Sequence, residues 1–134
     1  MEKRKILLVD DNATVLRSIK ELLENSYDVT VAKSGAKALE LMRKDKPDLI
    51  LLDYEMPEMD GRDVFMSMRT DMDLFSIPVI FLTGVNDREH IAQALALRPA
   101  GYLLKPVSTM KLNQTIESVI REYYEMNGFA PDGM

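Results

Sequence analysis

Five short apolar runs alternate along the chain with stretches in which apolar residues recur at helical spacing. The runs are KILLVD at 5–10, YDVTVA at 27–32, DLILLD at 48–53, PVIFLT at 78–83 and GYLLK at 101–105. Strands that alternate with helices in this way are typical of a parallel sheet covered by helices on both faces. The pattern therefore predicts an α/β domain with five parallel strands and five helices.

The composition of the five runs also predicts how the strands are ordered. Positions 6–9, 49–52 and 79–82 are wholly apolar, as expected for strands that are buried on both faces. The second run alternates Val29 and Val31 with polar residues, and the fifth run is short, so these two fit the edges of the sheet. The doubly wound, flavodoxin-like order 2-1-3-4-5 satisfies these positions with right-handed crossovers.

Four of the five helices are indicated by clear apolar stripes. The stripes fall within 15–23, 38–42, 91–95 and 112–123, and a less regular helix is expected near 61–70. Ser34, Asp60 and Ser108 are candidates for helix N-caps, and Asn86 with Glu89 has the spacing of a capping box. We expect one domain over 1–126, followed at 127–134 by a disordered tail or the beginning of a linker.

Composition and charge narrow the function classes. The 134 residues include no cysteine, which excludes a disulfide framework and any cysteine-based metal site or nucleophile. No apolar run is long enough to cross a bilayer and no signal peptide is recognisable, so a cytoplasmic protein without a membrane partner is expected. The net charge is −5 and no basic stripe is present, so nucleic acid is not expected to be a direct ligand.

Polar side chains follow the strands at the edge where a doubly wound sheet binds its ligands. Asp10 and Asp11 come after the first strand, Asp53 after the third, Thr83 after the fourth and Lys105 after the fifth. Taken singly, each has an ordinary role, such as a helix cap, a turn residue or a solvated charge. Taken together, they are expected to converge on one site.

Three carboxylates at this edge require a positive partner. At ~5 Å and an effective dielectric constant of 20, each pair of carboxylates repels by about 3 kcal/mol. Lys105 offsets one charge, and a site of carboxylates, a loop carbonyl and waters suits Mg²⁺ first and Mn²⁺ next. Thr83 and Lys105 are the donor types that would hold phosphoryl oxygens, which leaves Asp53 as the best placed nucleophile.

The segments VDD, LLDYEMPEMDG, FLTG and YLLKP, in this order and at these spacings, resemble the response-regulator receiver domain of two-component signalling. The resemblance covers residues 4–126. It implies that Asp53 is the phosphoacceptor, that Asp11 binds Mg²⁺ directly and Asp10 largely through water, and that the backbone carbonyl of Glu55 completes the protein ligands.

The resemblance also implies roles for residues of the last two strands. Thr83 matches the hydroxyl residue that moves to bind the phosphoryl group, and Lys105 matches the cation of the site. Tyr102 matches the aromatic residue that changes rotamer on activation, and Pro106 matches a cis peptide that would orient Lys105. Glu55 and Val85 match the positions that tune how water reaches the phosphoryl group, so they are expected to affect dephosphorylation.

A phosphorylation-activated switch is the function that the resemblance implies. The phosphoryl group would come from a phosphohistidine of a sensor histidine kinase or a histidine phosphotransfer protein. The face formed by the fourth helix, the fifth strand and the fifth helix would then control an output protein or a C-terminal effector domain. The domain would hydrolyse its own phosphate slowly without being a turnover enzyme, and the sequence leaves open whether phosphorylation drives homodimerisation.

Three alternative functions remain open at this stage. An aspartate-nucleophile phosphatase of the haloacid-dehalogenase type would have a similar strand-end aspartate, but its motif has a second Asp where this chain has Glu55. The other two alternatives are a docking module that is never phosphorylated and a flavin-binding domain.

The chain departs from the family pattern at one place. The family often has Gly-Ala-Asp-Asp before the aromatic of the fifth strand, where this chain has RPAG at 98–101.

Overall fold

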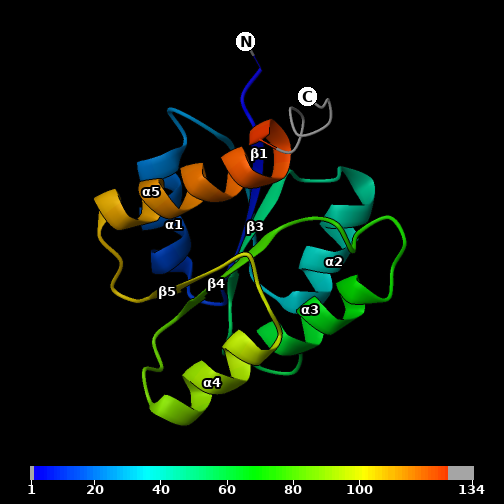
Figure 1. Ribbon diagram of the computed structural model, residues 1–134, viewed down its shortest axis with the longest axis vertical. Helices are drawn as coiled ribbons and strands as arrows, with labels where there is room; N and C mark the ends of the chain where they lie inside the picture. Colours follow the sequence, from blue (N-terminus) through cyan, green and yellow to red (C-terminus); the bar gives the residue numbers. More distant parts are fainter. Residues whose placement is uncertain (1, 127–134) are drawn as a thin grey trace.

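The computed structural model describes residues 2–126, which form one sheet with helices on both faces (Figure 1). The strands are β1 (Lys5–Val9), β2 (Asp28–Ala32), β3 (Leu49–Asp53), β4 (Val79–Thr83) and β5 (Gly101–Leu104). They are all parallel and stand in the order β2-β1-β3-β4-β5, which confirms the predicted sheet. The tail expected at 127–134 lies outside the described residues.

The helices alternate with the strands along the chain. They are α1 (Ala13–Leu23), α2 (Gly35–Lys44), α3 (Gly61–Arg69), α4 (Arg88–Ala96) and α5 (Thr109–Ile120), and α5 continues into the π-helical turn η1 (Arg121–Met126). None of these helices combines the length and the apolar character that a membrane-spanning segment needs. The less regular helix expected near 61–70 is α3, and its apolar face is formed by Val64, Phe65 and Met68.

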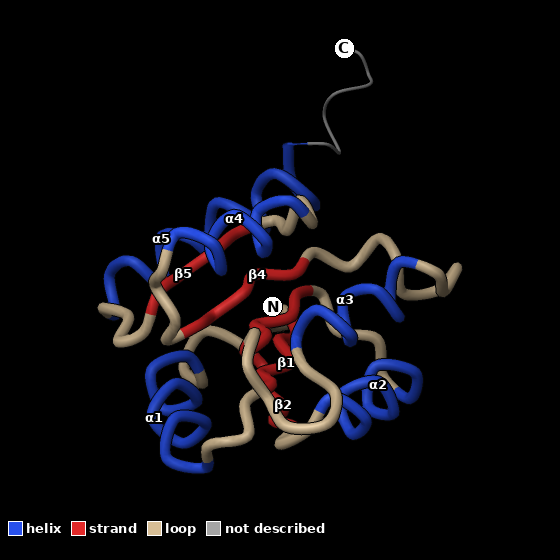
Figure 2. Tube along the Cα trace, turned by 90° about the horizontal axis from the view of Figure 1, so that it is seen from below, coloured by secondary structure: helices blue, strands red, loops and turns tan. Residues whose placement is uncertain are grey.

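Two apolar clusters, one on each face of the sheet, form the core. On one face, β-strand side chains pack with buried residues of α1 and α5, such as Leu16 and Ile116. On the other face they pack with buried residues of α2, α3 and α4, such as Met42, Phe65 and Ala94. In Figure 1, α1 and α5 lie to the left of the sheet and α2 and α3 to its right, and Figure 2 shows α1 and α2 on opposite sides of β1 and β2. Because β1, β3 and β4 are covered on both faces, their continuous apolar composition is explained.

Most helix caps agree with the sequence, but the beginning of α4 was predicted one residue too early. Ser34, Asp60 and Ser108 accept backbone N–H groups as N-caps of α2, α3 and α5. At α4 the cap is Asp87, which accepts from the N–H of His90, so the capping box expected for Asn86 and Glu89 is wrong. Asn and Asp are nearly equal as N-caps, and pattern alone does not decide between neighbours.

The RPAG segment has an unusual backbone conformation. Arg98, which follows the C-cap residue Leu97 of α4, has a φ of 58° although it is not a glycine. It stands where the family pattern often has glycine, the residue that adopts this conformation without steric cost. The departure from the pattern is therefore accommodated by backbone strain at the exit of α4, and the chain still enters β5 in the expected register.

Candidate functional site

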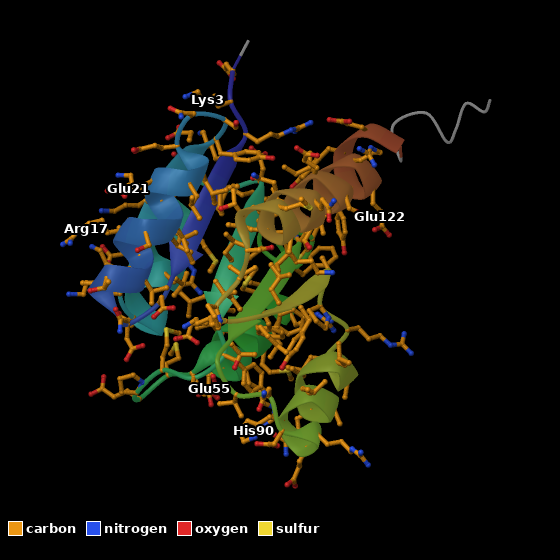
Figure 3. The ribbon with its side chains drawn as sticks, turned by 90° about the vertical axis from the view of Figure 1, so that its left-hand side faces the viewer. Lys3, Arg17, Glu21, Glu55, His90 and Glu122 are labelled. Atoms are coloured by element: carbon orange, nitrogen blue, oxygen red, sulfur yellow. The ribbon has the colours of Figure 1, made fainter. Side chains whose placement is uncertain are left out.

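Parallel strand register brings the polar residues at the strand ends to one edge of the sheet. Val9 pairs with Leu52, Asp53 with Leu82, and Thr83 with Leu104, so β1, β3, β4 and β5 end at nearly the same level. Asp53 and Thr83, the last residues of β3 and β4, therefore lie at the same edge as Asp10, Asp11 and Lys105, which follow β1 and β5. Figure 3 shows Glu55, which lies two residues beyond β3, at the opposite end of the molecule from Lys3.

Three carboxylates form the acidic part of this site. Asp10, Asp11 and Asp53 each place a carboxylate oxygen within 4.8 Å of the others. Asp10 and Asp53 are only 1% and 4% exposed, whereas Asp11 faces solvent. The side chain of Asn12, rather than that of Asp11, caps α1. Asp11 is therefore not the N-cap of α1, and its carboxylate is not used for capping.

Lys105 is the cation of the site. Its Nζ donates to Asp10 Oδ2 at 2.6 Å and lies 3.5 Å from Asp53 Oδ1. Burial lowers the pKa of Lys105, but the hydrogen bond to Asp10 and the charge of Asp53 outweigh it, so the pKa is raised above 10.5. The peptide bond between Lys105 and Pro106 is cis. Lys105 is therefore charged and is held between the two buried carboxylates.

One cation does not compensate the charge of this cluster. The pKa of Asp53 is raised from 3.8 to about 7, first because of burial and second because of the charge of Asp10, while Lys105 acts in the opposite direction. The Glu55 N–H donates to Asp53 Oδ1 at 3.2 Å and also favours the ionised form. Ionisation of Asp53 is unfavourable because it is buried and two other acids lie nearby. A hard dication that prefers oxygen ligands would offset this negative charge, so the three carboxylates suit such an ion.

Thr83 and Glu55 are joined beside the acidic cluster. Thr83 is 1% exposed, and its hydroxyl donates to Glu55 Oε1 at 2.5 Å. The Val85 N–H donates to the same Thr83 oxygen at 3.1 Å. From the sequence, Glu55 was expected to act through its backbone carbonyl and to affect dephosphorylation, whereas its side-chain contact with Thr83 was not predicted. An acid two residues past one strand and a hydroxyl at the end of the neighbouring strand are the signal that could have indicated it.

Tyr102 lies next to this pair, in β5. Its ring packs against the apolar cluster of α2, α3 and α4, and its hydroxyl is buried without a hydrogen-bond partner among residues 2–126. Burial raises the pKa of Tyr102, and the charge of Glu55 raises it further. Tyr102 is therefore near enough to Glu55 for their electrostatic interaction to count, although no hydrogen bond joins them.

Gly61 holds the loop after β3 against the strand end. The loop contains Pro57, and the Gly61 N–H donates to the Tyr54 carbonyl at 3.0 Å. A Cβ atom at Gly61 would lie 2.5 Å from the Asp53 carbonyl oxygen and 2.8 Å from the Tyr54 Cα. These distances are shorter than real Cβ contacts and involve backbone atoms. Only glycine lets the first turn of α3 approach Asp53 this closely.

Known proteins share this sequence pattern and this fold. The family model described as "Response regulator receiver domain" matches residues 6–117. Among similar proteins, the probable transcriptional regulator ycf27 of Porphyridium aerugineum is 36% identical over 90% of this chain and 50% of its own length. The alkaline phosphatase synthesis transcriptional regulatory protein PhoP of Bacillus subtilis is 34% identical over 88% of this chain and 49% of its own length. The chain thus spans about half the length of these relatives.

Solved structures agree with this assignment. The signal receiver domain of a histidine kinase from Syntrophus aciditrophicus superposes with a TM-score of 0.83 at 28% identity, covering 92% of this chain and 94% of that one. The chemotaxis protein CheY4 of Vibrio cholerae superposes with a TM-score of 0.80 at 28% identity, covering 87% of this chain and 98% of that one. The family model, the similar proteins and the solved structures all agree with the geometry of the site. The chain therefore belongs to the response regulator receiver domains of two-component signalling, which act as phosphorylation-activated switches.

Proposed function

We propose that this domain, over residues 1–126, accepts a phosphoryl group on Asp53 from a phosphohistidine of a sensor histidine kinase or a histidine phosphotransfer protein. The observation that carries the proposal is the position of Asp53, which is buried among a second carboxylate, a charged Lys105 and the Thr83 strand end. An Asp53 carboxylate oxygen would form a bond to phosphorus while the bond from phosphorus to the histidine nitrogen breaks. The freed imidazole nitrogen keeps the electron pair.

Asp10, Asp11 and Asp53, with the backbone carbonyl of Glu55, are the proposed ligands of Mg²⁺, and Mn²⁺ would fit the same donors. The close approach of the three carboxylates and the raised pKa of Asp53 support this assignment. When bound, the ion would neutralise charge on the phosphoryl oxygens. Lys105 would bind one phosphoryl oxygen through its Nζ, and the Thr83 hydroxyl would bind another.

The proposed output surface consists of α4, β5 and α5. A phosphoryl group adds charge and acceptor oxygens, and each hydrogen bond to it contributes about 1.5 to 3 kcal/mol. Reversing a 1:99 equilibrium needs roughly 5.5 kcal/mol, so Thr83 and Lys105 together would supply most of the shift. Tyr102, which lies in β5, would change rotamer and report the shift to an output protein or a C-terminal effector domain. A homodimer formed on phosphorylation is one form that this output could take.

The proposed setting is the cytoplasm, with no direct contact to nucleic acid or membrane. We propose a signalling domain that loses its phosphoryl group slowly, rather than an enzyme with turnover. Glu55 and Val85, beside Asp53 and Thr83, are the proposed tuning positions for that loss. An unchanged decay rate of the phosphorylated protein in Glu55→Ala would count against the role of Glu55.

Intact mass after incubation with a small acyl phosphate, with and without Mg²⁺, tests the proposed function. We expect one phosphoryl group on the wild type, dependent on Mg²⁺, and none on Asp53→Asn. Asp73→Asn, which changes an exposed acid outside the site, is the matched control and is expected to behave as the wild type. Absence of an adduct on the wild type, or an equal adduct on Asp53→Asn, would overturn the assignment of Asp53.

A further inference from the structure

The hydroxyl proton of Thr83 is already engaged in this structure. A threonine hydroxyl has one proton to donate, and Thr83 donates it to Glu55 Oε1 at 2.5 Å. Its oxygen also accepts the Val85 N–H, which fixes the direction of the side chain. For Thr83 to donate to a phosphoryl oxygen, the hydrogen bond to Glu55 has to be broken first.

Within residues 2–126, Thr83 is the only hydrogen-bond partner of the Glu55 carboxylate. Its second oxygen, Oε2, is buried and has no hydrogen-bond partner among residues 2–126. A buried carboxylate oxygen without a donor is unfavourable, so the hydrogen bond from Thr83 stabilises the Glu55 carboxylate at a position where its other oxygen is unsatisfied. The charge of Glu55 also acts on Asp53, whose pKa it raises, so the two carboxylates repel each other before any phosphoryl group is added.

We propose that the Glu55 side chain restrains the switch hydroxyl in the unphosphorylated domain by competing with the phosphoryl group for the Thr83 proton. This inference rests on the proposed function of Asp53. Adding a phosphoryl group to Asp53 increases the negative charge facing Glu55, which favours release of Thr83. Glu55 is thus a positioning residue that acts through Thr83, and it sets how readily the domain changes from the unphosphorylated to the active arrangement.

The proposal predicts a specific coupling between two substitutions. Glu55→Ala removes the competing acceptor, and Thr83→Val removes the hydroxyl while keeping a β-branched side chain in the buried strand. The measured quantity is the affinity for beryllofluoride, a non-covalent phosphoryl mimic, in the presence of Mg²⁺. A hydrogen bond to a charged group corresponds to about a tenfold change or more, so Glu55→Ala is expected to bind beryllofluoride about 10-fold more tightly than the wild type.

The double variant distinguishes competition for the hydroxyl from simple charge repulsion. If Glu55 acts through Thr83, the gain in affinity caused by Glu55→Ala is clearly smaller in the Thr83→Val background than in the wild-type background, where only the charge repulsion between Glu55 and Asp53 is left to be relieved. If Glu55→Ala strengthens binding equally in both backgrounds, the effect is repulsion alone and the proposal is overturned. Glu58→Gln removes an exposed charge from the same loop and is expected to leave the affinity within a factor of about two of the wild type.

A second measurement on the metal-free protein tests the contact itself. The free energies of unfolding of the two single variants and the double variant are expected to be non-additive, because each substitution removes the same hydrogen bond. Additive values would show that the contact does not hold Thr83, which would also overturn the proposal. If the wild type binds no beryllofluoride, the proposed function fails together with this inference, whereas binding without coupling refutes the role of Glu55 alone.

Discussion

Lys105 Nζ lies 2.6 Å from Asp10 Oδ2, although the two residues are 95 positions apart in the sequence. Asp10 is buried, and the Asn12 N–H occupies its other oxygen at 2.9 Å. The contact joins the ends of β1 and β5, two strands that are not neighbours in the sheet. It therefore closes the acidic site across the ends of β3 and β4 and brings the Lys105 charge within 3.5 Å of Asp53.

Replacement of Lys105 by methionine is expected to destabilise the metal-free protein. Two buried carboxylates would lose their cation, and a buried charge without a partner costs about 1 to 3 kcal/mol or more. Chemical denaturation near pH 8 should show the loss, and added Mg²⁺ should restore part of it. Lys111→Met, which changes an exposed lysine of α5, is the control. An unchanged free energy of unfolding in Lys105→Met would mean that Lys105 does not compensate these acids.

Stabilisation by Mg²⁺ is expected to increase with pH. Because the pKa of Asp53 is raised from 3.8 to about 7, the folded protein binds a proton between about pH 4 and pH 7 that the unfolded chain does not bind. The contribution of Asp53 to the free energy of unfolding of the metal-free protein therefore falls as pH rises through this window. Mg²⁺ requires the ionised carboxylate, so its binding competes with this proton.

Thermal unfolding with and without Mg²⁺ checks this expectation. The rise in Tm caused by Mg²⁺ should be larger near pH 8 than near pH 5.5 in the wild type. Asp53→Asn removes the titrating group, so its response to Mg²⁺ should depend less on pH. Equal stabilisation of the wild type at both pH values would show that protonation of Asp53 does not oppose Mg²⁺.

Gly61→Ala is expected to disturb the site through the backbone. The added Cβ would meet the Asp53 carbonyl at 2.5 Å and the Tyr54 Cα at 2.8 Å, so α3 or the strand end has to move. Overpacking of this kind costs about 1 to 3 kcal/mol. We expect a lower free energy of unfolding and slower phosphorylation by an acyl phosphate. Gly84→Ala is a useful contrast because nothing lies within 4 Å of its Cβ position, and wild-type behaviour of Gly61→Ala would contradict the predicted clash.

Arg98→Gly is expected to stabilise the protein. Arg98 has a left-handed conformation with a φ of 58°, which costs a non-glycine residue about 1 to 2 kcal/mol, and glycine would remove this cost. Glycine also loses more conformational entropy on folding, which would offset about 0.5 to 1 kcal/mol of this stabilisation. The Arg98 side chain is exposed, so little packing is lost. Denaturation by urea should show an increase of roughly 0.5 to 1 kcal/mol, and Arg98→Ala, which cannot relieve the strain, should not. A decrease in Arg98→Gly would indicate that the side chain makes a stabilising contact.

The sheet and the set of residues at its edge were predictable from the sequence for a physical reason. Strands buried on both faces have to be continuously apolar, and parallel strands joined by helices have to end at one edge. Asp53, Thr83 and Lys105 could therefore be assigned to a common site without knowing any distance. The beginning of α4 was not predictable to one residue, because Asn86 and Asp87 are almost equally good caps and the choice depends on the local backbone.

What the sequence by itself determined was the fold and the set of residues that gather at one edge of the sheet, since these follow from the period of apolar positions and the places where the strands end. The family was indicated by the resemblance of four motifs, VDD, LLDYEMPEMDG, FLTG and YLLKP. What only the tertiary structure decided were the pairings within the site: Lys105 with Asp10 at 2.6 Å, and Thr83 with the Glu55 side chain at 2.5 Å. Each polar side chain at this edge has several acceptable partners within reach. Which contact forms depends on strand register, loop path and burial, and these are properties of the packed molecule rather than of any short segment.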